Sequence, residues 1–329
     1  MDWRRENMIV VTGAAGFIGS AFLWELNRAG IEEIIVADKL RNEDKWKNLV
    51  KRHYFDWIDR DELIEKLQSG EIKPKAIVHM GACSATTEKD GDFLIKNNYE
   101  YSKKLWEIAA EQEINFVYAS SAATYGAGEN GYSDDHGLIR ELRPLNKYGY
   151  SKQLFDVWAL KQQKTPKIWA GLKFFNVYGP NEYHKGRMAS VVLHAFNQAK
   201  HEGKVKLFKS HREDYQDGGQ LRDFVYIKDV IKVIKFFADG KGKSGIYNLG
   251  TGKARSFYDL ALNTMKFAGK SPNIEYIDMP VDIRDKYQYF TEADMKKLTE
   301  CGYSEEFYSL EDGVKDYVQN YLMNEDIYL

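Results

Sequence analysis

Residues Met8–Ser20 read Met-Ile-Val-Val-Thr-Gly-Ala-Ala-Gly-Phe-Ile-Gly-Ser. The apolar run is too short for a buried helix and leads at once into Gly13, Gly16 and Gly19, which indicates a buried parallel strand, a glycine turn and a helix. Gly13 would make the tight turn, Gly16 would let a pyrophosphate approach the backbone, and Gly19 would let the helix lie close to the strand. Because an ordinary strand-to-helix turn can give the same short pattern, the rest of the chain has to decide.

A second predicted strand favours a dinucleotide site. Glu33–Asp38 ends in an acid 19 residues after Gly19, near the spacing at which such an acid meets an adenosine ribose hydroxyl. The chain then becomes basic at Lys39, Arg41, Lys45 and Lys47. A charge run is usually a solvated loop, but these cations follow the strand where a 2′-phosphate would project. Asp38 favours NAD and the cations favour NADP; we expect NADP, with NAD as the alternative.

Length and composition narrow the class of protein. At 329 residues, of which 43% are apolar, the chain should form one large domain and a smaller lobe. A net charge of −2 gives no global field for nucleic acid or anionic membrane, so we expect small-molecule partners. Cys83 and Cys301 cannot build a disulfide framework or a metal cluster. Met1–Asn7 is polar and no segment is long enough to span a bilayer, so we expect a cytoplasmic protein.

The remaining pattern alternates strands and helices, which is typical of a doubly wound parallel sheet. Further strands are predicted at Lys75–Met80, Ile114–Ala119, Ile168–Phe175, Lys206–Phe208, Leu221–Tyr226 and Gly245–Gly250. Helices are predicted at Phe17–Ala29, from Asn97-Asn98 onward, and at Gln153–Gln163, Met188–Ala199 and Asp229–Ala238. Capping pairs predict three more helix starts at Ser256 with Asp259, Thr291 with Asp294, and Ser309 with Asp312.

These elements predict an α/β protein with a Rossmann-type sheet and a smaller C-terminal α/β substrate lobe. We expect the dinucleotide-binding domain at 1–176 plus about 223–252, and the lobe at 177–222 and 253–329. His184–Arg187 is expected to be a basic loop. His79 is expected to pack within its strand rather than bind a metal, because no second metal-type residue has suitable spacing.

Three side chains suggest chemistry on a carbinol. Tyr148 and Lys152 are four residues apart, so on a helix they would share a face, and Ser121 follows a predicted strand. Lowering the pKa of a tyrosine from ~10 to ~7 takes roughly 4 kcal/mol, which Lys152 and a positive nicotinamide ring could supply. Ser121 would hold the substrate oxygen. The alternative is a packed tyrosine beside a solvated lysine.

Longer motifs support the chemical interpretation. The chain resembles the extended short-chain dehydrogenase/reductase family over nearly its full length, on the runs Thr12–Gly19, Ser120–Gly126 and Tyr148–Lys152. More specific runs are similar to the members that epimerise carbon 6 of an ADP-linked heptose for the lipopolysaccharide inner core. These runs are Gly81–Glu88, Asn97–Lys103, Phe175–Pro180, His184–Gly186 and Arg222–Tyr226.

The resemblance implies an NADP-dependent epimerase that inverts carbon 6 of ADP-D-glycero-D-manno-heptose through a transient ketone. Tyr148 and Lys185 would be the acid/base residues, assisted by Ser121, and Lys152 would bind the cofactor ribose. Together with the residues derived above, the expected cofactor contacts are Gly13, Gly16, Phe17, Ile18, Gly19, Asp38, Lys39, Lys45, Arg60, Met80, Gly81, Ala82, Cys83, Ser84, Asn97, Lys152, Val177 and Lys185. The expected substrate contacts are Ser121, Asn176, Arg187, His194, Phe208, Lys209, Ser210, His211, Arg222 and Tyr287. We expect no metal ion in the site. We expect the protein to form a homo-oligomer.

The sequence departs from the family pattern at two places. Met80 stands where family members often have an acid, and Gln216–Gln220 lies in an apparent insertion before Arg222.

The chemistry of epimerisation explains why we expect a second residue that exchanges protons. The hydrogen on an exocyclic carbinol carbon is not acidic, so it must leave as hydride, and the resulting ketone must rotate to be reduced on its other face. Both faces then need a proton donor, and Lys185 could serve the face that Tyr148 does not reach.

Three alternatives remain open. Another nucleotide-sugar epimerase of the family would share the main motifs. A 4,6-dehydratase would commonly have Asp-Glu directly after the active-site serine or threonine, where this chain has Ala122-Ala123. A catalytically inactive NADP-binding sensor could keep the fold, but it would have no reason to retain Ser121, Tyr148, Lys152 and Lys185 together.

Overall fold

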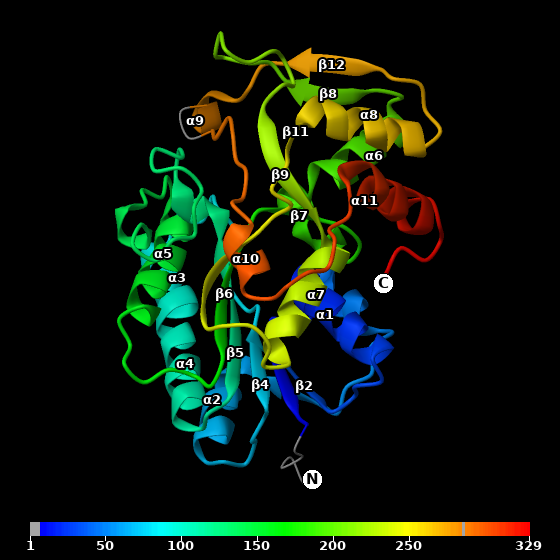
Figure 1. Ribbon diagram of the computed structural model, residues 1–329. Helices are drawn as coiled ribbons and strands as arrows, with labels where there is room; N and C mark the ends of the chain where they lie inside the picture. The colour runs from blue at the N-terminus through cyan, green and yellow to red at the C-terminus, as the bar shows by residue number, and fades with distance from the viewer. Residues whose placement is uncertain (1–6, 285–286) are drawn as a thin grey trace.

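The stretch Met8–Ser20 folds as its pattern predicts. The computed structural model describes residues 7–284 and 287–329, and its first strand, β1 (Ile9–Thr12), feeds a glycine turn into α1 (Phe17–Arg28) (Figure 1). Gly13 has φ +64°, a conformation that glycine adopts freely. A Cβ on Gly19 would lie 2.2 Å from the Gly13 carbonyl oxygen, so only glycine lets the helix close onto the turn.

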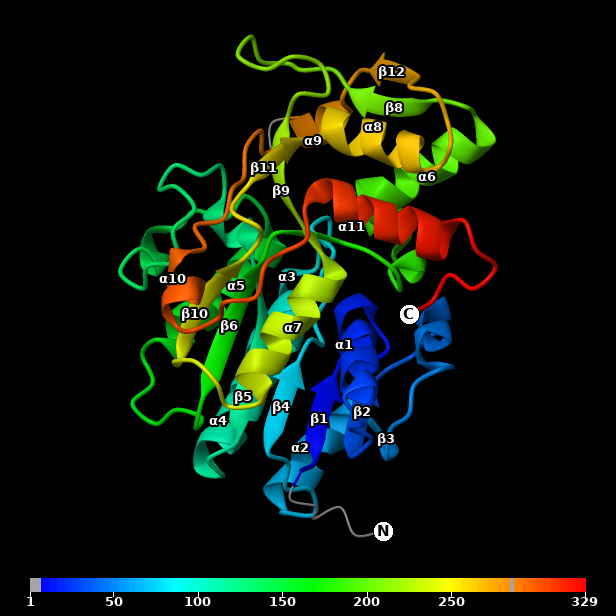
Figure 2. The same cartoon turned by 45° about the vertical axis from the view of Figure 1, so that its right-hand side comes forward.

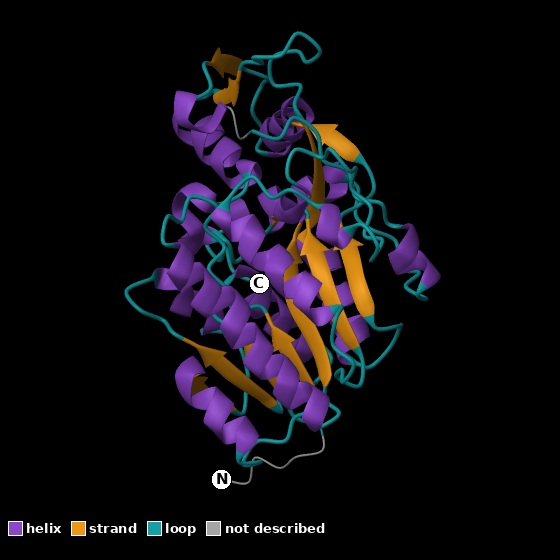
Figure 3. Cartoon of the chain, turned by 90° about the vertical axis from the view of Figure 1, so that its left-hand side faces the viewer, coloured by secondary structure: helices purple, strands orange, loops and turns teal. Residues whose placement is uncertain are grey.

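β1 lies inside a parallel sheet of seven strands, counted over the described residues, in the order β10-β6-β5-β4-β1-β2-β3. The strands that join β1 are β2 (Ile34–Asp38), β3 (Asp56–Asp59), β4 (Ala76–His79), β5 (Asn115–Ser121), β6 (Trp169–Phe174) and β10 (Gly245–Leu249). Figure 3 shows these strands side by side with helices packed against them. The doubly wound parallel sheet is thereby confirmed.

Helices cover both faces of this sheet because both faces are apolar. α1 and α7 (Ile227–Ala238) lie on one face, and α2 (Arg60–Gln68), α4 (Tyr101–Glu111) and α5 (Lys147–Ala159) lie on the other (Figure 2). Successive residues of β1 divide between the two cores: Ile9 and Val11 join the α1 side, and Val10 joins the α4 side. Alternation of side chains along a strand is the cause.

The second lobe lies at the carboxyl end of the sheet, at the top of Figure 1. Its small sheets are β11-β9-β7 and β12-β8. Their strands are β7 (Asn176–Tyr178), β8 (Val205–Phe208), β9 (Leu221–Tyr226), β11 (Ala254–Ser256) and β12 (Ile274–Ile277). The lobe helices are α6 (Val191–His201), α8 (Phe257–Phe267), α9 (Val281–Arg284) and α11 (Leu310–Tyr317). The chain enters this lobe after β6, returns through α7 to β10, and enters it again at β11, so the lobe is built from separate segments.

Shorter helices complete the chain. They are α3 (Gly91–Leu94), α10 (Lys296–Glu300), the 3₁₀-helices η1 (Asp44–Leu49), η3 (Ala122–Tyr125), η4 (Ile139–Glu141) and η5 (Tyr183–Met188), and the π-helical turns η2 (Ile95–Glu100) and η6 (Val318–Leu322).

Several predicted boundaries were wrong. The helix expected from Asn97 begins at Gly91, because Asp90 accepts a hydrogen bond from Phe93 N at 2.9 Å and caps it. That helix continues through η2 into α4. The strand β12 was missed because it is a short, half-buried edge segment, and with β11 it follows β10, which had been expected to be the last strand.

The helix start expected at Thr291 was also wrong. The Thr291 hydroxyl lies 3.5 Å from Asp223 N, and the next helix begins only at Lys296, where Asp294 accepts from the Lys296 amide at 3.0 Å. The other two capping pairs do begin helices, α8 at Ser256 and α11 at Ser309.

Other predictions differ in detail from the structure. His184–Arg187 lies in the 3₁₀-helix η5 rather than in an open loop, and α6 begins at Val191, after the cap Ser190. β9 pairs within the three-stranded sheet of the lobe, and the proposed domain limits stay a prediction. Residues 1–6, part of the polar Met1–Asn7 segment, lie outside the described residues.

Candidate active site

A cavity of about 750 Å³ opens at the carboxyl end of the parallel sheet. Its walls are the loops after β1, β2 and β4, the end of β5, the start of α5, the segment around η5, and Phe257 and Leu260 of α8. Ligands of open α/β sheets bind at this edge, because the strand order changes direction there and the loops part.

The first turn of α1 is built to receive an anion. Its N-cap is Gly16, which makes no side-chain capping hydrogen bond, and no acidic residue lies in the first turn. Phe17 and Ile18, the first two residues of the helix, line the cavity. An uncapped N-terminus of a helix attracts phosphate through its free amides and its dipole.

The glycine turn packs directly on the loop after β4. A Cβ on Gly13 would lie 2.5 Å from Gly81 N, so the two loops touch through backbone and leave the space in front of them open. This cradle and the uncapped helix fit the pyrophosphate of a dinucleotide.

Asp38 ends β2, lines the cavity and is already bonded on both carboxylate oxygens. One accepts from Ala15 N at 2.9 Å, and the other accepts from Lys45 Nζ at 2.9 Å and from Lys39 N at 2.7 Å. Asp38 is buried, so Lys45 balances its charge inside the protein. The negative charge of Asp38 therefore repels a nearby phosphate less strongly than the sequence alone suggests.

The other cations of this region divide between internal pairs and the cavity. Lys39 forms an ion pair with Asp61, and Lys47 pairs with Asp44 away from the cavity lining. Arg41 lines the cavity and makes no ion pair with any residue in the described ranges. Arg60 donates to Asn97 and lies 4.3 Å over the Tyr101 ring. Arg41 thus remains available for a phosphate.

Tyr148 and Lys152 stand on one face of α5, next to the end of β5. The helix begins because Asn146 accepts from Gly149 N at 2.8 Å. Lys152 is buried and donates to the Ala119 carbonyl at 2.9 Å. Burial lowers the pKa of Lys152 to about 8, although Asp156 opposes this shift. The ammonium is therefore still largely present at neutral pH.

The expected lowering of the Tyr148 pKa is not produced by the protein alone. Burial raises the pKa of this phenol, and the hydrogen bond with Ser121 opposes the rise. Desolvation disfavours the phenolate, so the positive charge of a bound nicotinamide ring, which the prediction included, would have to offset it.

Lys185 lies on η5, in the lining of the same cavity as Tyr148. Its Nζ is 5.3 Å from the centroid of the Phe17 ring. Burial lowers the pKa of Lys185, and the carboxylate of Glu182 opposes the shift. A lysine whose pKa is brought nearer to neutrality is better suited to exchange protons.

The cavity gathers much of the predicted site. All predicted catalytic and cofactor-contacting residues line it, together with the predicted substrate contacts Ser121 and Asn176. The structure does not bring eight predicted substrate contacts into this lining: Arg187, His194, Phe208, Lys209, Ser210, His211, Arg222 and Tyr287.

Three of those eight, Phe208, Arg222 and Tyr287, form a neighbouring cluster in the lobe. The Arg222 guanidinium lies 5.1 Å over the Tyr287 ring and 5.7 Å over Phe257, a cavity residue. Tyr287 also packs edge-on against Phe208, with ring centroids 6.4 Å apart. Phe257 therefore connects this cluster to the cavity.

Sequence reasoning missed several lining residues. Phe257 and Leu260 come from the far end of the chain and carry no local signal of a site. His184 also lines the cavity, and burial lowers its pKa to about 4, so it is neutral at pH 7. Its position next to Lys185, within the run His184–Gly186 that resembles the family, was a usable signal.

The described residues contain neither a metal-binding group nor a membrane-spanning helix. No group of three or more His, Cys, Asp or Glu side chains within 7–284 and 287–329 is placed to hold a metal ion. His79 instead bonds Thr12 at 2.6 Å and Ser102 at 2.9 Å inside the core, as expected. Among the helices of the same ranges, none combines the length and the apolar character that crossing a membrane requires.

Comparison with known proteins gives consistent results. Residues 9–250 match the model of the NAD dependent epimerase/dehydratase family. The chain is similar to an ADP-L-glycero-D-manno-heptose-6-epimerase of Fusobacterium nucleatum, 59% identical over 98% of this chain and 100% of that protein. A protein of the same name from Nitratidesulfovibrio vulgaris is 52% identical over 98% and 100% of the two chains. A crystal structure of the Helicobacter pylori ADP-L-glycero-D-manno-heptose-6-epimerase superposes with a TM-score of 0.80, at 31% identity over 96% of each chain.

Proposed function

The chain belongs to the NAD dependent epimerase/dehydratase family, and from this membership we propose that it is an ADP-glyceromanno-heptose 6-epimerase. Its reaction inverts carbon 6 of ADP-D-glycero-D-manno-heptose to give the ADP-L-glycero epimer. The observation that carries the proposal is the presence of two proton-exchanging side chains, Tyr148 and Lys185, in the lining of one nucleotide-sized cavity. Inversion needs a proton acceptor and donor for either face of a planar ketone.

A nicotinamide cofactor, when bound, supplies hydride removal and return at the carbinol carbon. Tyr148 would take the hydroxyl proton while Ser121 holds the oxygen by a hydrogen bond. Lys152 would favour the phenolate through its charge and, from its place beside Ala119, contact the cofactor ribose. Lys185 would exchange the proton when the ketone presents its other face.

The dehydratase alternative is less favoured by the site. Elimination of water needs an additional acid/base pair, and the positions after Ser121 are Ala122 and Ala123, neither of which can ionise. Ala123 lines the cavity, so an uncharged methyl group stands where that pair would act. The role in lipopolysaccharide synthesis, the cytoplasmic location and the homo-oligomer stay predictions.

The activity can be tested directly. The purified protein should convert ADP-D-glycero-D-manno-heptose to a mixture of both epimers, measured by NMR of the heptose signals. In deuterated water we expect no deuterium at carbon 6, because the hydrogen moves as hydride and never exchanges with solvent. A dehydrated product, or solvent deuterium at carbon 6, would contradict the proposed mechanism.

The cofactor gives a second prediction. We expect nucleotide extracted from the purified protein to be NADP in excess over NAD, because Lys45 neutralises Asp38 and Arg41 is left to bind a 2′-phosphate. Arg41→Gln should lower the ratio of bound NADP to NAD. Lys47→Gln is the matched control, since Lys47 pairs with Asp44 and does not line the cavity. Extraction of NAD alone from the unmodified protein would refute this preference.

A further inference from the structure

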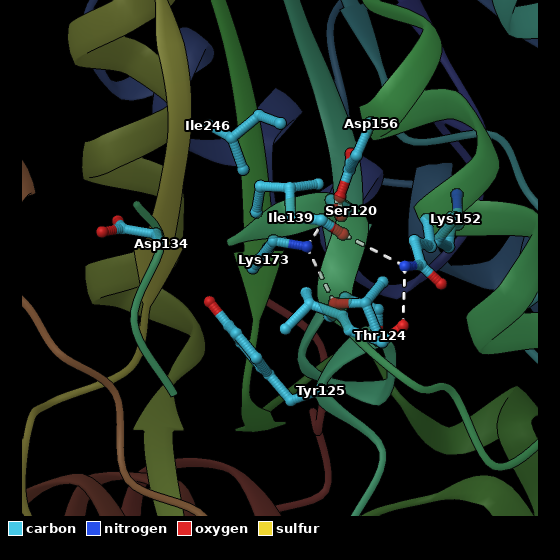
Figure 4. A network of polar contacts seen from close by, with 12 residues as sticks. Ser120, Thr124, Tyr125, Asp134, Ile139, Lys152, Asp156, Lys173 and Ile246 are labelled. Carbon is cyan, nitrogen blue, oxygen red and sulfur yellow. Dashed lines mark hydrogen bonds and ion pairs between the residues drawn. The ribbon is translucent and has the colours of Figure 1, made fainter. Parts of the chain in front are cut away.

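A buried ion pair lies directly behind the proposed catalytic residues. Lys173 Nζ on β6 is 2.7 Å from Asp156 Oδ2 on α5, and both side chains are 0% exposed. Figure 4 shows the Lys173 amine between Asp156, Thr124 and the Tyr125 ring. Neither member of the pair lines the cavity, so the pair does not touch a ligand there.

The Asp156 carboxylate bonds the strand that carries Ser121. Ser120 Oγ donates to Asp156 Oδ2 at 2.7 Å, and Tyr118 OH donates to Asp156 Oδ1 at 3.0 Å. Both donors belong to β5. Asp156 therefore fastens the last turn of α5 to this strand.

Tyr148, Lys152 and Asp156 lie on one face of α5. This face makes the contacts with the end of β5 that the proposed chemistry requires. Tyr148, Lys152 and Asp156 follow each other at intervals of four residues, so they lie above one another on the helix. Lys152 bonds Ala119, and Tyr148 meets Ser121. A rotation or slide of α5 would disturb all of these contacts together.

Lys173 reaches the other side of Ser121. Its Nζ donates to Thr124 Oγ1 at 2.8 Å, and the Thr124 hydroxyl donates to the Ser121 carbonyl at 2.8 Å. The amine also lies 5.3 Å from the centroid of the Tyr125 ring. The pair thus holds Ser121 from two sides, through Ser120, which precedes it, and through Thr124, three residues after it.

We propose that the Asp156–Lys173 pair is a positioning element of the active site, which fixes α5 against β5 so that Tyr148 meets Ser121 and which keeps Lys152 charged. The inference rests on the proposed function for the roles of Tyr148 and Lys152. Stability alone is a weak explanation for the pair, because apolar residues of similar volume often replace a buried ion pair without loss.

The charge of Asp156 acts on Lys152 against burial. The charged or titratable groups that face Lys152 are Asp156 and Tyr148 on its own helix, Cys83 after β4, and His79 on β4. Burial lowers the Lys152 pKa, while Asp156 and Cys83 raise it. His79 is buried and its pKa is well below its ordinary value, so it adds no positive charge at neutral pH. Without Asp156, the Lys152 ammonium would lose its proton at a lower pH.

Asp156→Asn tests the proposal, because it keeps the shape and removes the charge. We expect kcat to fall about tenfold to a hundredfold, with little change in KM and with cofactor still bound. The alkaline limb of the kcat profile should move to lower pH by about half a unit or more. Asp229→Asn is the matched control, since Asp229 is equally buried, on α7. It should change the melting temperature without moving the pH profile.

The double variant Asp156→Asn/Lys173→Met separates positioning from stability. In this variant neither charge of the pair is left buried without its partner, so the variant should melt closer to the unmodified protein than Asp156→Asn does. We still expect a low kcat and a shifted alkaline limb. Recovery of normal kcat and normal pH profile would overturn the proposal, as would a normal profile in Asp156→Asn. If Asp156→Asn does not fold, the double variant carries the test.

Failure of the proposed function can be told apart from failure of this inference. If the unmodified protein does not turn over the ADP-heptose, the proposed function fails. The titration of Lys152, followed by NMR of protein with isotope-labelled lysine, needs no substrate. The midpoint of this titration should lie at lower pH in Asp156→Asn than in the unmodified protein. An unchanged midpoint would overturn this inference and leave the proposed function standing.

Discussion

Tyr148→Phe should retain the fold and the bound cofactor and lose at least about a hundredfold of epimerisation, the low end of general acid/base effects. The substitution removes only the hydroxyl group, and the ring can keep its place at the cavity wall. Lys152 and its bond to Ala119 do not involve that hydroxyl. The loss should therefore appear in kcat, measured by NMR conversion of either epimer at saturating substrate, rather than in KM.

Tyr150→Phe is the matched control for this variant. Tyr150 lies on the same helix two residues away, and 54% of it is exposed to solvent. It should keep normal turnover. Near-normal turnover in Tyr148→Phe would show that another group takes the substrate proton, and the assignment of Tyr148 would have to be withdrawn.

Lys185→Met should damage the chemical step while substrate binding changes little. The expected effect on the single-turnover rate is again about a hundredfold or more, because a methionine cannot give or accept a proton. Lys185 has a lowered pKa from burial, which suits proton exchange near neutral pH. Rates should be measured at saturating substrate from each epimer, since the two directions begin with opposite faces of the ketone.

A phosphate clamp is the competing role for Lys185, and it predicts a different kinetic pattern. Loss of a clamp would weaken binding and leave the single-turnover rate at saturation normal in both directions. That result would remove Lys185 from the catalytic residues and leave Tyr148 to serve both faces. Lys200→Met is a control for loss of a lysine nearby in sequence, because Lys200 is an exposed residue at the end of α6.

The glycine turn and the strand that ends in Asp38 could be predicted because their signals are local in sequence. Gly13 has the positive φ of the turn, Gly19 packs against that same turn, and the strand ending in Asp38 follows within a short stretch. Such patterns can be recognised without knowledge of the fold, because they follow from local backbone conformation and helix geometry.

The rest depended on contacts between distant segments. Phe257 reaches the cavity only after the chain has crossed between the parallel sheet and the second lobe, and its neighbours in sequence do not indicate a site. Thr291 has the pattern of a helix cap, yet its hydroxyl lies near Asp223 on another strand. The raised pKa of Tyr148 comes from burial, which sequence spacing does not reveal.

The separate segments of the second lobe have a consequence for how the protein unfolds. Because α7 and β10 separate β9 from β11 along the chain, no single cut releases the lobe as one continuous piece. Loss of the parallel sheet would pull apart the ends that β9 and β11 need to pair. The two parts are therefore tied into one cooperative unit, and a nucleotide that binds only the sheet edge protects the lobe from heat and protease as well.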